Sequence, residues 1–176
     1  MSELQTIAET DLKSLFDSQQ RTAIKLKASS ASERIGRLIK LKEVVIAHTD
    51  KIVEALHNDY KKPEEEAKLE IGPITDEIDY IIAFLESWMK PQIVTTPEAM
   101  GGDAAVSKII LEPKGACLFI TPWNYPFLLT FRPLIACLAA GNTVIIKPSE
   151  LTPQSSKIIK QIIEQAFPED EVAVIQ

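Results

Sequence analysis

The sequence has few cysteines and histidines and no long apolar run, and each shortage excludes a class of protein. Its two cysteines, Cys117 and Cys137, lie in apolar stretches, which argues against a disulfide framework and for a reducing compartment. Its two histidines, His48 and His57, have no paired cysteines or acidic cluster nearby, so we expect no metal site. No run approaches the roughly 20 apolar residues of a membrane-spanning helix, and residues 1–20 have neither a signal-peptide core nor a basic transit-peptide bias.

An excess of basic residues is also missing. The 19 Lys and Arg residues are outnumbered by 25 Asp and Glu, and the charges are interspersed, so we expect no nucleic-acid partner. Neither G-x-G-x-x-G nor G-x-x-x-x-G-K-[ST] occurs, so these phosphate-binding motifs suggest no function. What the 176 residues do allow is a substantial core, because a domain of roughly 150 residues buries about 70% of its unfolded surface.

Helical periodicity dominates the first half of the chain. Ser30 and Glu33 have the spacing of a capping box, which predicts a helix that begins near Ala31. Thr49-Asp50 is a candidate cap for a second helix. Apolar residues then recur at helical intervals up to Met89, although Gly72-Pro73 is expected to interrupt or kink this third stretch.

The second half changes to short strands. Two strand-like runs, 93–96 and 105–111, are separated by glycines and predict a hairpin arm. Next comes an unbroken apolar run that suits a strand covered on both faces. The order strand, helix, strand, helix, strand predicts a right-handed parallel α/β layer. Its expected elements are 115–120, 127–140, 143–146, a helix capped by Thr152 with Pro153 at its first position, and 172–175.

A polar cluster follows each of the first two strands of this layer, and ligands of open α/β sheets bind at such strand ends. Asn124 lies between Pro122 and Pro126, which fix the local backbone, so its amide could be the rigid donor that an oxyanion hole needs. The alternative is that Asn124 caps the next helix. Trp123 could line the mouth of a pocket or belong to the core.

The second cluster offers one ammonium and one carboxylate. Lys147 and Glu150 are three residues apart, with Pro148 stiffening the turn, so both could face one crevice and bind the hydroxyls of a ribose. The alternative is a solvated surface ion pair. Neither cysteine has an adjacent cationic residue that would activate it, so both are expected to be structural.

Taken together, three motifs closely resemble the aldehyde dehydrogenase superfamily, and three further elements are similar to its class 3 branch. The motifs are residues 122–127, 138–143 and 147–153, and the class 3-like elements are residues 58–63, 70–73 and 88–91. The resemblance implies an α/β fold with N-terminal helices, a β-hairpin arm and the first part of a Rossmann-like parallel sheet. It implies a helical segment of the cofactor domain at 1–90, an oligomerisation arm at 91–112 and a partial NAD(P)-binding region at 113–176.

In that family an aldehyde is oxidised to a carboxylic acid: a cysteine thiolate attacks the carbonyl, hydride passes to NAD or NADP, and a glutamate activates water. By motif match, Asn124 would donate to the oxyanion. Cofactor contacts would come from Ile120, Thr121, Pro122, Trp123, Lys147, Ser149 and Glu150, and the substrate channel would include Tyr125, Leu129 and Arg132.

The family's nucleophilic cysteine and general-base glutamate have no counterpart in this sequence. We therefore expect an N-terminal portion of an aldehyde dehydrogenase, inactive alone, that uses NAD or possibly NADP and forms a homodimer through the arm. One alternative is a truncated, non-catalytic protein that binds a partner, and another is a semialdehyde dehydrogenase of the same superfamily. The expected location is the cytoplasm, although the C-terminal anchors of many class 3 relatives leave membrane association open.

Overall fold

Residues 9–88 contain four helices in the computed structural model, which describes residues 9–176. Ser30 and Glu33 make the predicted capping box, with the Ser30 hydroxyl accepting from Glu33 N at 3.2 Å and the Glu33 carboxylate accepting from Ser30 N at 2.7 Å. The mostly helical first half is confirmed. The signal-peptide expectation for residues 1–20 lies partly outside the described residues. The helices are α1 (Glu9–Lys27), α2 (Ala31–Ala47), α3 (Thr49–Tyr60) and α4 (Glu64–Trp88).

The expected cap of α3 is wrong, and so is the expected interruption of α4. Thr49 is the first residue of α3 and makes no cap, because its hydroxyl donates back to the Ile46 carbonyl at 2.8 Å. Pro73 lies inside α4 without interrupting it. Buried Ile71 and Ile74 lie on either side of Pro73, and this packing outweighs the single backbone hydrogen bond that a proline removes.

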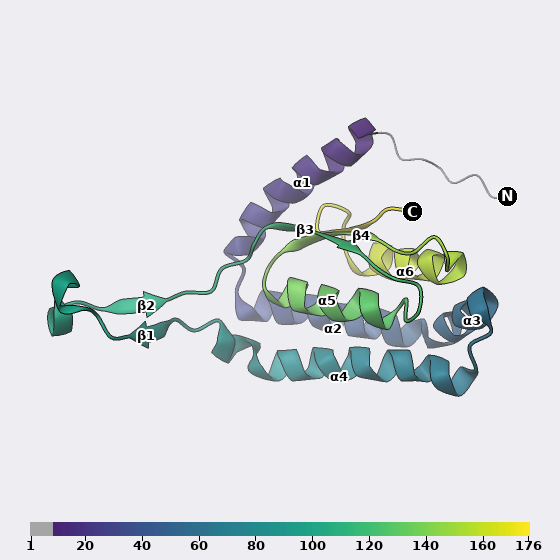
Figure 1. Cartoon of the computed structure of the whole chain (residues 1–176), viewed down its shortest axis with the longest axis horizontal. Coiled ribbons are helices and arrows are strands. Elements are labelled where there is room, and N and C mark those ends of the chain that lie inside the picture. The colour runs from purple at the N-terminus through teal and green to yellow at the C-terminus, as the bar shows by residue number, and fades with distance from the viewer. Residues whose placement is uncertain (1–8) are drawn as a thin grey trace.

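α1 is a helix that the sequence patterns did not predict. Gln19 is fully buried, and its amide donates to the carbonyls of Val144 and Glu169 at 3.0 and 3.1 Å. The Thr143 hydroxyl donates to the Gln19 carbonyl at 3.3 Å. Figure 1 shows α1 on one side of the sheet and α5 on the other. α1 is thus positioned by contacts with β4, a strand more than 100 residues further along the chain, which no local pattern encodes.

The predicted hairpin arm is present, with shorter strands than expected. β1 (Gln92–Val94) pairs antiparallel with β2 (Ser107–Ile109), and Ile93 lies opposite Lys108. Two short 3-10 turns, at Glu98–Met100 and Gly102–Ala104, form the tip. The arm projects away from the body of the molecule (Figure 1), so most of its side chains are exposed.

The α/β layer follows the predicted order. Its three strands are parallel and lie in the order β3-β4-β5, and the central strand β4 is the most buried. α5 and α6 connect them, and α5 packs between the sheet and α4. The elements are β3 (Ala116–Ile120), α5 (Leu128–Ala139), β4 (Thr143–Lys147), α6 (Pro153–Ala166) and β5 (Val172–Val174).

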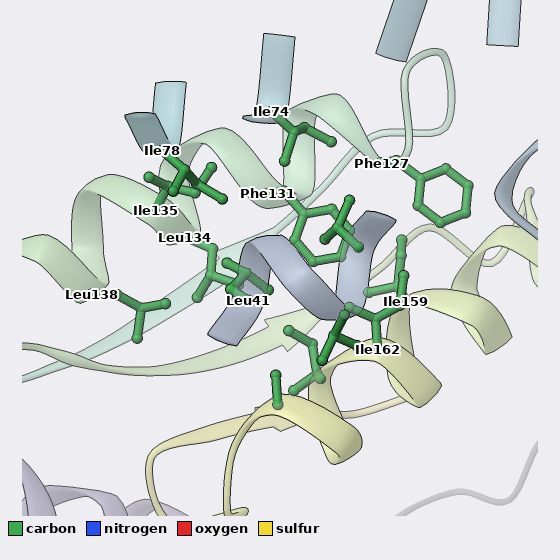
Figure 2. Packing of buried hydrophobic residues seen from close by; sticks show 14 of the residues in the cluster. Leu41, Ile74, Ile78, Phe127, Phe131, Leu134, Ile135, Leu138, Ile159 and Ile162 are labelled. Atoms are coloured by element: carbon green, nitrogen blue, oxygen red, sulfur yellow. The ribbon is translucent and has the colours of Figure 1, made fainter. Parts of the chain in front are cut away.

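The core lies on one side of this sheet. Figure 2 shows Ile74 and Ile78 of α4 beside Phe131 and Ile135 of α5, and each of these four side chains is fully buried. Burying a side chain of this size stabilises the fold by about 1.5–3 kcal/mol. This packing fixes α5, and with it the loop that precedes α5.

The expectation that β3 is covered on both faces is wrong. Leu118 and Ile120 are 59% and 73% exposed, whereas Phe119, on the opposite face, is only partly exposed and packs against the core. β3 is an edge strand of this sheet, and α1 does not cover its carboxyl end. The strand's apolar run therefore leaves one open apolar face beside the loops described next.

Candidate functional site

The two polar clusters meet at the carboxyl ends of β3 and β4. Ile120 is paired with Lys147 in the parallel ladder, and the Thr121 N–H donates to the Lys147 carbonyl at 3.1 Å. The 121–126 loop and the 147–150 turn therefore begin side by side. This adjacency is what the strand order predicted.

The 121–126 loop has a buried base and an exposed tip. At the base, the hydroxyls of Thr121 and Thr130 lie 2.9 Å apart and both residues are buried. At the tip, Trp123 is 50% exposed, so its alternative placement in the core is wrong. Pro122 and Asn124 are exposed as well. The fixed base thus presents the Trp123 ring and the Asn124 amide to solvent.

Asn124 does not cap α5. The N–H groups of Phe127 and Leu128 donate to Oε2 of Glu70 at 3.1 and 3.3 Å, so a carboxylate from α4 is the cap. The Asn124 carbonyl accepts from the Tyr60 hydroxyl at 3.4 Å. Within residues 9–176 its side-chain amide makes no hydrogen bond to another residue. The helix-cap alternative for Asn124 is therefore wrong, and its amide is available to a ligand.

Glu70 belongs to a buried cluster behind this loop. Its Oε1 lies 2.5 Å from Nζ of Lys62 and 3.4 Å from the hydroxyl of Tyr60. Burial, and then the nearby Glu70 carboxylate, raise the pKa of Tyr60, so this hydroxyl stays protonated as a donor. The Tyr60 ring meets Trp123 edge to face at 6.5 Å, and Lys62 lies 4.1 Å above the ring centre of Tyr125.

Lys147 and Glu150 form an ion pair with exposed side chains. The hydrogen bond from Lys147 lowers the pKa of the Glu150 carboxyl, so Glu150 is ionised at neutral pH. Ser149 is buried between them, and its hydroxyl accepts from Leu151 N at 3.2 Å. In this structure Lys147 and Glu150 therefore form a solvated surface ion pair, as the alternative interpretation has it. The pair lies at the carboxyl end of β4.

The start of α6 is also capped by a residue that is distant in the sequence. Thr152 occupies the N-cap position, as predicted, but its side chain makes no cap bond. Asp59 of α3 accepts from the N–H groups of Gln154 and Ser155 at 3.0 and 2.8 Å, and from the Ser155 hydroxyl at 2.7 Å. Sequence reasoning missed Asp59, Tyr60, Lys62 and Glu70 as part of the site. Their only signal was membership in the class 3-like elements 58–63 and 70–73.

The expected substrate-channel residues separate into two groups. Tyr125 and Leu129 are exposed near the start of α5. Arg132, one turn further, is held by Glu77 of α4 at 2.9 Å. Arg132 therefore faces α4, and this structure does not bring it to the tip of the 121–126 loop.

Cys137 behaves as a structural residue. Cys137 is buried in α5, and burial, followed by its neighbour Cys117, raises its thiol pKa, so it is not activated. Among the described residues, no group of His, Cys, Asp or Glu side chains could hold a metal ion. None of the helices described for residues 9–176 has the length and apolar character required to cross a membrane.

A parallel sheet flanked by helices, with two polar loops at neighbouring strand ends, defines an open α/β protein, a class in which ligands typically bind at such an edge. The chain matches the aldehyde dehydrogenase family over residues 1–176 and belongs to that family. This confirms both the resemblance and the fold class, including the Rossmann-like parallel sheet.

Individual relatives agree with this assignment. The chain is 40% identical over 167 residues to 4,4'-diaponeurosporen-aldehyde dehydrogenase of Staphylococcus aureus, covering 94% of this chain and 34% of the relative. It is 37% identical over 144 residues to aldehyde dehydrogenase family 3 member H1 of Arabidopsis thaliana, covering 81% of this chain and 29% of the relative. The substrate-bound structure of Staphylococcus aureus AldH superposes with a TM-score of 0.88 at 36% identity, over 93% of this chain and 36% of that one. The chain thus spans about a third of the length of these relatives.

Proposed function

We propose that this chain supplies the oxyanion-side loop and the adenosine side of the cofactor groove in an NAD(P)-dependent aldehyde dehydrogenase. The observation that carries the proposal is the pairing of Ile120 with Lys147, which sets the Asn124 loop and the Lys147–Glu150 pair side by side. The substrate would be a small-molecule aldehyde. Nucleophilic and general-base groups would come from sequence outside this chain.

In this proposal the Asn124 amide donates a hydrogen bond to the aldehyde oxygen as negative charge develops there. Two observations support the role: the loop backbone is fixed at its base by the Thr121–Thr130 contact, and the amide has no competing helix-cap role. A preorganised donor needs no reorientation when the charge appears, which is why one such donor lowers the barrier substantially.

The residues present fit the adenosine half of a nicotinamide dinucleotide. Ile120 offers an open apolar surface, and Lys147 and Glu150 offer a donor and an acceptor for ribose hydroxyls. When bound, the nicotinamide ring would accept the hydride. The residues proposed to line this groove are Ile120, Thr121, Pro122, Trp123, Lys147, Ser149 and Glu150, and Tyr125 and Leu129 are proposed to face the aldehyde.

The pyrophosphate of the cofactor would need a binding partner other than these groove residues. Dinucleotide sites often place this group at the N-terminus of the helix that follows a strand. Here Glu70 occupies the start of α5 and Asp59 occupies the start of α6. A carboxylate at each of these helix ends repels an anion, so we propose that the pyrophosphate is bound outside residues 9–176.

The test is an Asn124→Ala variant of the protein expressed from the complete reading frame that encodes this chain. We expect turnover of an aldehyde to fall on the order of 10²- to 10³-fold, the cost of one oxyanion-hole donor. Asn58→Ala is the matched control, because Asn58 is an exposed asparagine of α3. Turnover within a factor of a few of the unmodified enzyme would remove Asn124 from this role.

For the 176-residue chain alone we propose no aldehyde oxidation and at most weak NAD binding. Cys137 is buried and lacks the environment of a thiolate, and no cationic residue is adjacent to Cys117 in the sequence. An absorbance assay for NADH or NADPH with a medium-chain aldehyde tests activity, and isothermal titration tests binding. Measurable turnover, or NAD affinity equal to that of an intact dehydrogenase, would overturn this part.

We also propose that the arm mediates a homodimer and that the protein works in the cytoplasm. Ile93, Val106 and Leu111 are each at least 70% exposed on the arm, where apolar side chains and strand edges invite pairing. Light scattering of the chain and of an Ile93→Ser/Val106→Ser variant tests the dimer: a monomer in both cases would contradict it. Fractionation of cells that express the tagged complete reading frame tests the location.

A further inference from the structure

The strongest feature that this function leaves unused is the buried Glu70 carboxylate. Glu70 is 0% exposed and accepts from four donors: Lys62, Tyr60, and the N–H groups of Phe127 and Leu128. Both carboxylate oxygens are used. The cluster therefore joins the α3–α4 corner to the point where the 121–126 loop enters α5.

Each of the three residues at the loop tip touches this cluster. The Trp123 ring meets Tyr60, the Asn124 carbonyl accepts from Tyr60, and the Tyr125 ring lies under Lys62. Both Tyr60 and Lys62 are held by Oε1 of Glu70. One carboxylate thus contacts both of the side chains that the three tip residues meet.

We propose that Glu70 is a positioning residue for the Asn124 amide, acting through Tyr60 and Lys62 and through the start of α5. This inference rests on the oxyanion role proposed for Asn124. A shift of about 1 Å in a catalytic group can cost as much as 100-fold in rate, so a rigid support for the loop has a direct functional use.

The energetics favour this role over simple stabilisation. A buried ion pair often contributes little to stability, because desolvation offsets the attraction between the charges. A helix start can be capped by a local Ser, Thr, Asp or Asn, and α5 has no such local cap. The fold instead uses a buried carboxylate that caps α5 and also binds Tyr60 and Lys62, which contact the loop. A positioning role explains these additional contacts, whereas capping alone does not.

The first test is spectroscopic and uses the 176-residue chain. A Trp88→Phe background leaves Trp123 as the only tryptophan. We expect Glu70→Gln to raise acrylamide quenching of Trp123, by up to about twofold, because the ring is 50% exposed in the native loop. The matched control is Glu171→Gln, which removes a partly buried ion pair with Arg37 at the opposite end of the strands and should leave quenching unchanged.

Two further variants keep this test decisive. If Glu70→Gln alone does not fold, Glu70→Gln/Lys62→Met removes both charges at similar volume, and circular dichroism reports whether it folds. We expect raised quenching there too. Lys62→Arg, which keeps the cation next to Glu70 and Tyr125, should retain native quenching. Unchanged quenching in the folded Glu70 variants would overturn the proposal.

The second test measures kinetics on the protein from the complete reading frame. We expect Glu70→Gln to lower kcat about 10- to 100-fold with little change in the KM for the cofactor, and to add almost nothing in an Asn124→Ala background. Additive losses would refute positioning. If Asn124→Ala itself has near-normal turnover, the oxyanion proposal fails, and the Trp123 measurement still decides whether Glu70 positions the loop.

Discussion

The start of α6 offers a quantitative prediction, because the residue that caps it differs from the one at its N-cap position. Asp59 accepts three hydrogen bonds from Gln154 and Ser155 across 95 residues of sequence or more. Thr152 is almost fully buried, and within the described part of the chain its hydroxyl has no partner. We therefore expect Asp59→Ala to destabilise the fold and Thr152→Val to leave stability nearly unchanged.

The size of the Asp59 effect follows from the bonds that are lost. Removing a helix cap costs about 0.5–2 kcal/mol, and a hydrogen bond to a charged group contributes about 1.5–3 kcal/mol. The three bonds share one carboxylate and Asp59 is only partly buried, so they are not additive and water replaces part of the loss. We expect the free energy of unfolding to fall by about 2 kcal/mol for Asp59→Ala and by about 1 kcal/mol for Asp59→Asn.

Thr152→Val keeps the shape of the side chain and removes only the hydroxyl. Because that hydroxyl is buried without a partner, its loss should change the free energy of unfolding by less than about 0.5 kcal/mol or increase it. Urea unfolding followed by far-UV circular dichroism measures both variants with a common m-value. A larger loss for Thr152→Val than for Asp59→Ala would refute the assignment of the cap to Asp59.

Three further predictions concern single residues. Gly141 has φ 87°, and a Cβ there would lie 2.7 Å from the Arg34 guanidinium, so Gly141→Ala should cost about 1–3 kcal/mol in urea unfolding. Bonds from Ser30 lower the pKa of Glu33 from its ordinary 4.5, so its stabilisation is present above that value and is lost as pH falls through the lowered pKa. Glu33→Gln should therefore flatten the acid limb of a stability profile. Cys137 should resist iodoacetamide in the folded chain and react in urea, as mass spectrometry would show.

Most elements could be predicted from local sequence. The capping box at Ser30, the hairpin between residues 91 and 112 and the alternating strands and helices after residue 113 depend on neighbours within a few positions. Where local rules failed, a distant contact decided the outcome. Pro73 is tolerated because isoleucines around it are buried, and α1 is held by contacts with a strand that follows it by more than 100 residues.

The candidate site also has one part that the sequence could predict and one part that it could not. Its loops could be located from strand ends and from the family resemblance, since parallel strands place their carboxyl ends at one edge. The residues that support these loops could not be located in this way. Glu70 and Asp59 are separated by 57 and 95 residues from the N–H groups whose hydrogen bonds they accept. A carboxylate on a helix is typical of a solvated face, and only tertiary packing shows which one is buried against another helix.

These two carboxylates give the N-terminal helices a specific part in the site. Asp59 and Glu70 lie on either side of the α3–α4 turn, and each one binds the start of a helix that follows a site loop. A displacement of this turn would therefore move the 121–126 loop and the 147–150 turn together. Because protein carboxylates already occupy both helix starts, neither N-terminus is free to bind a phosphate, and the oxyanion proposed here would depend on the side-chain amide of Asn124 rather than on a helix N-terminus. The α3–α4 turn thus links the position of the proposed oxyanion loop to that of the proposed ribose-binding pair.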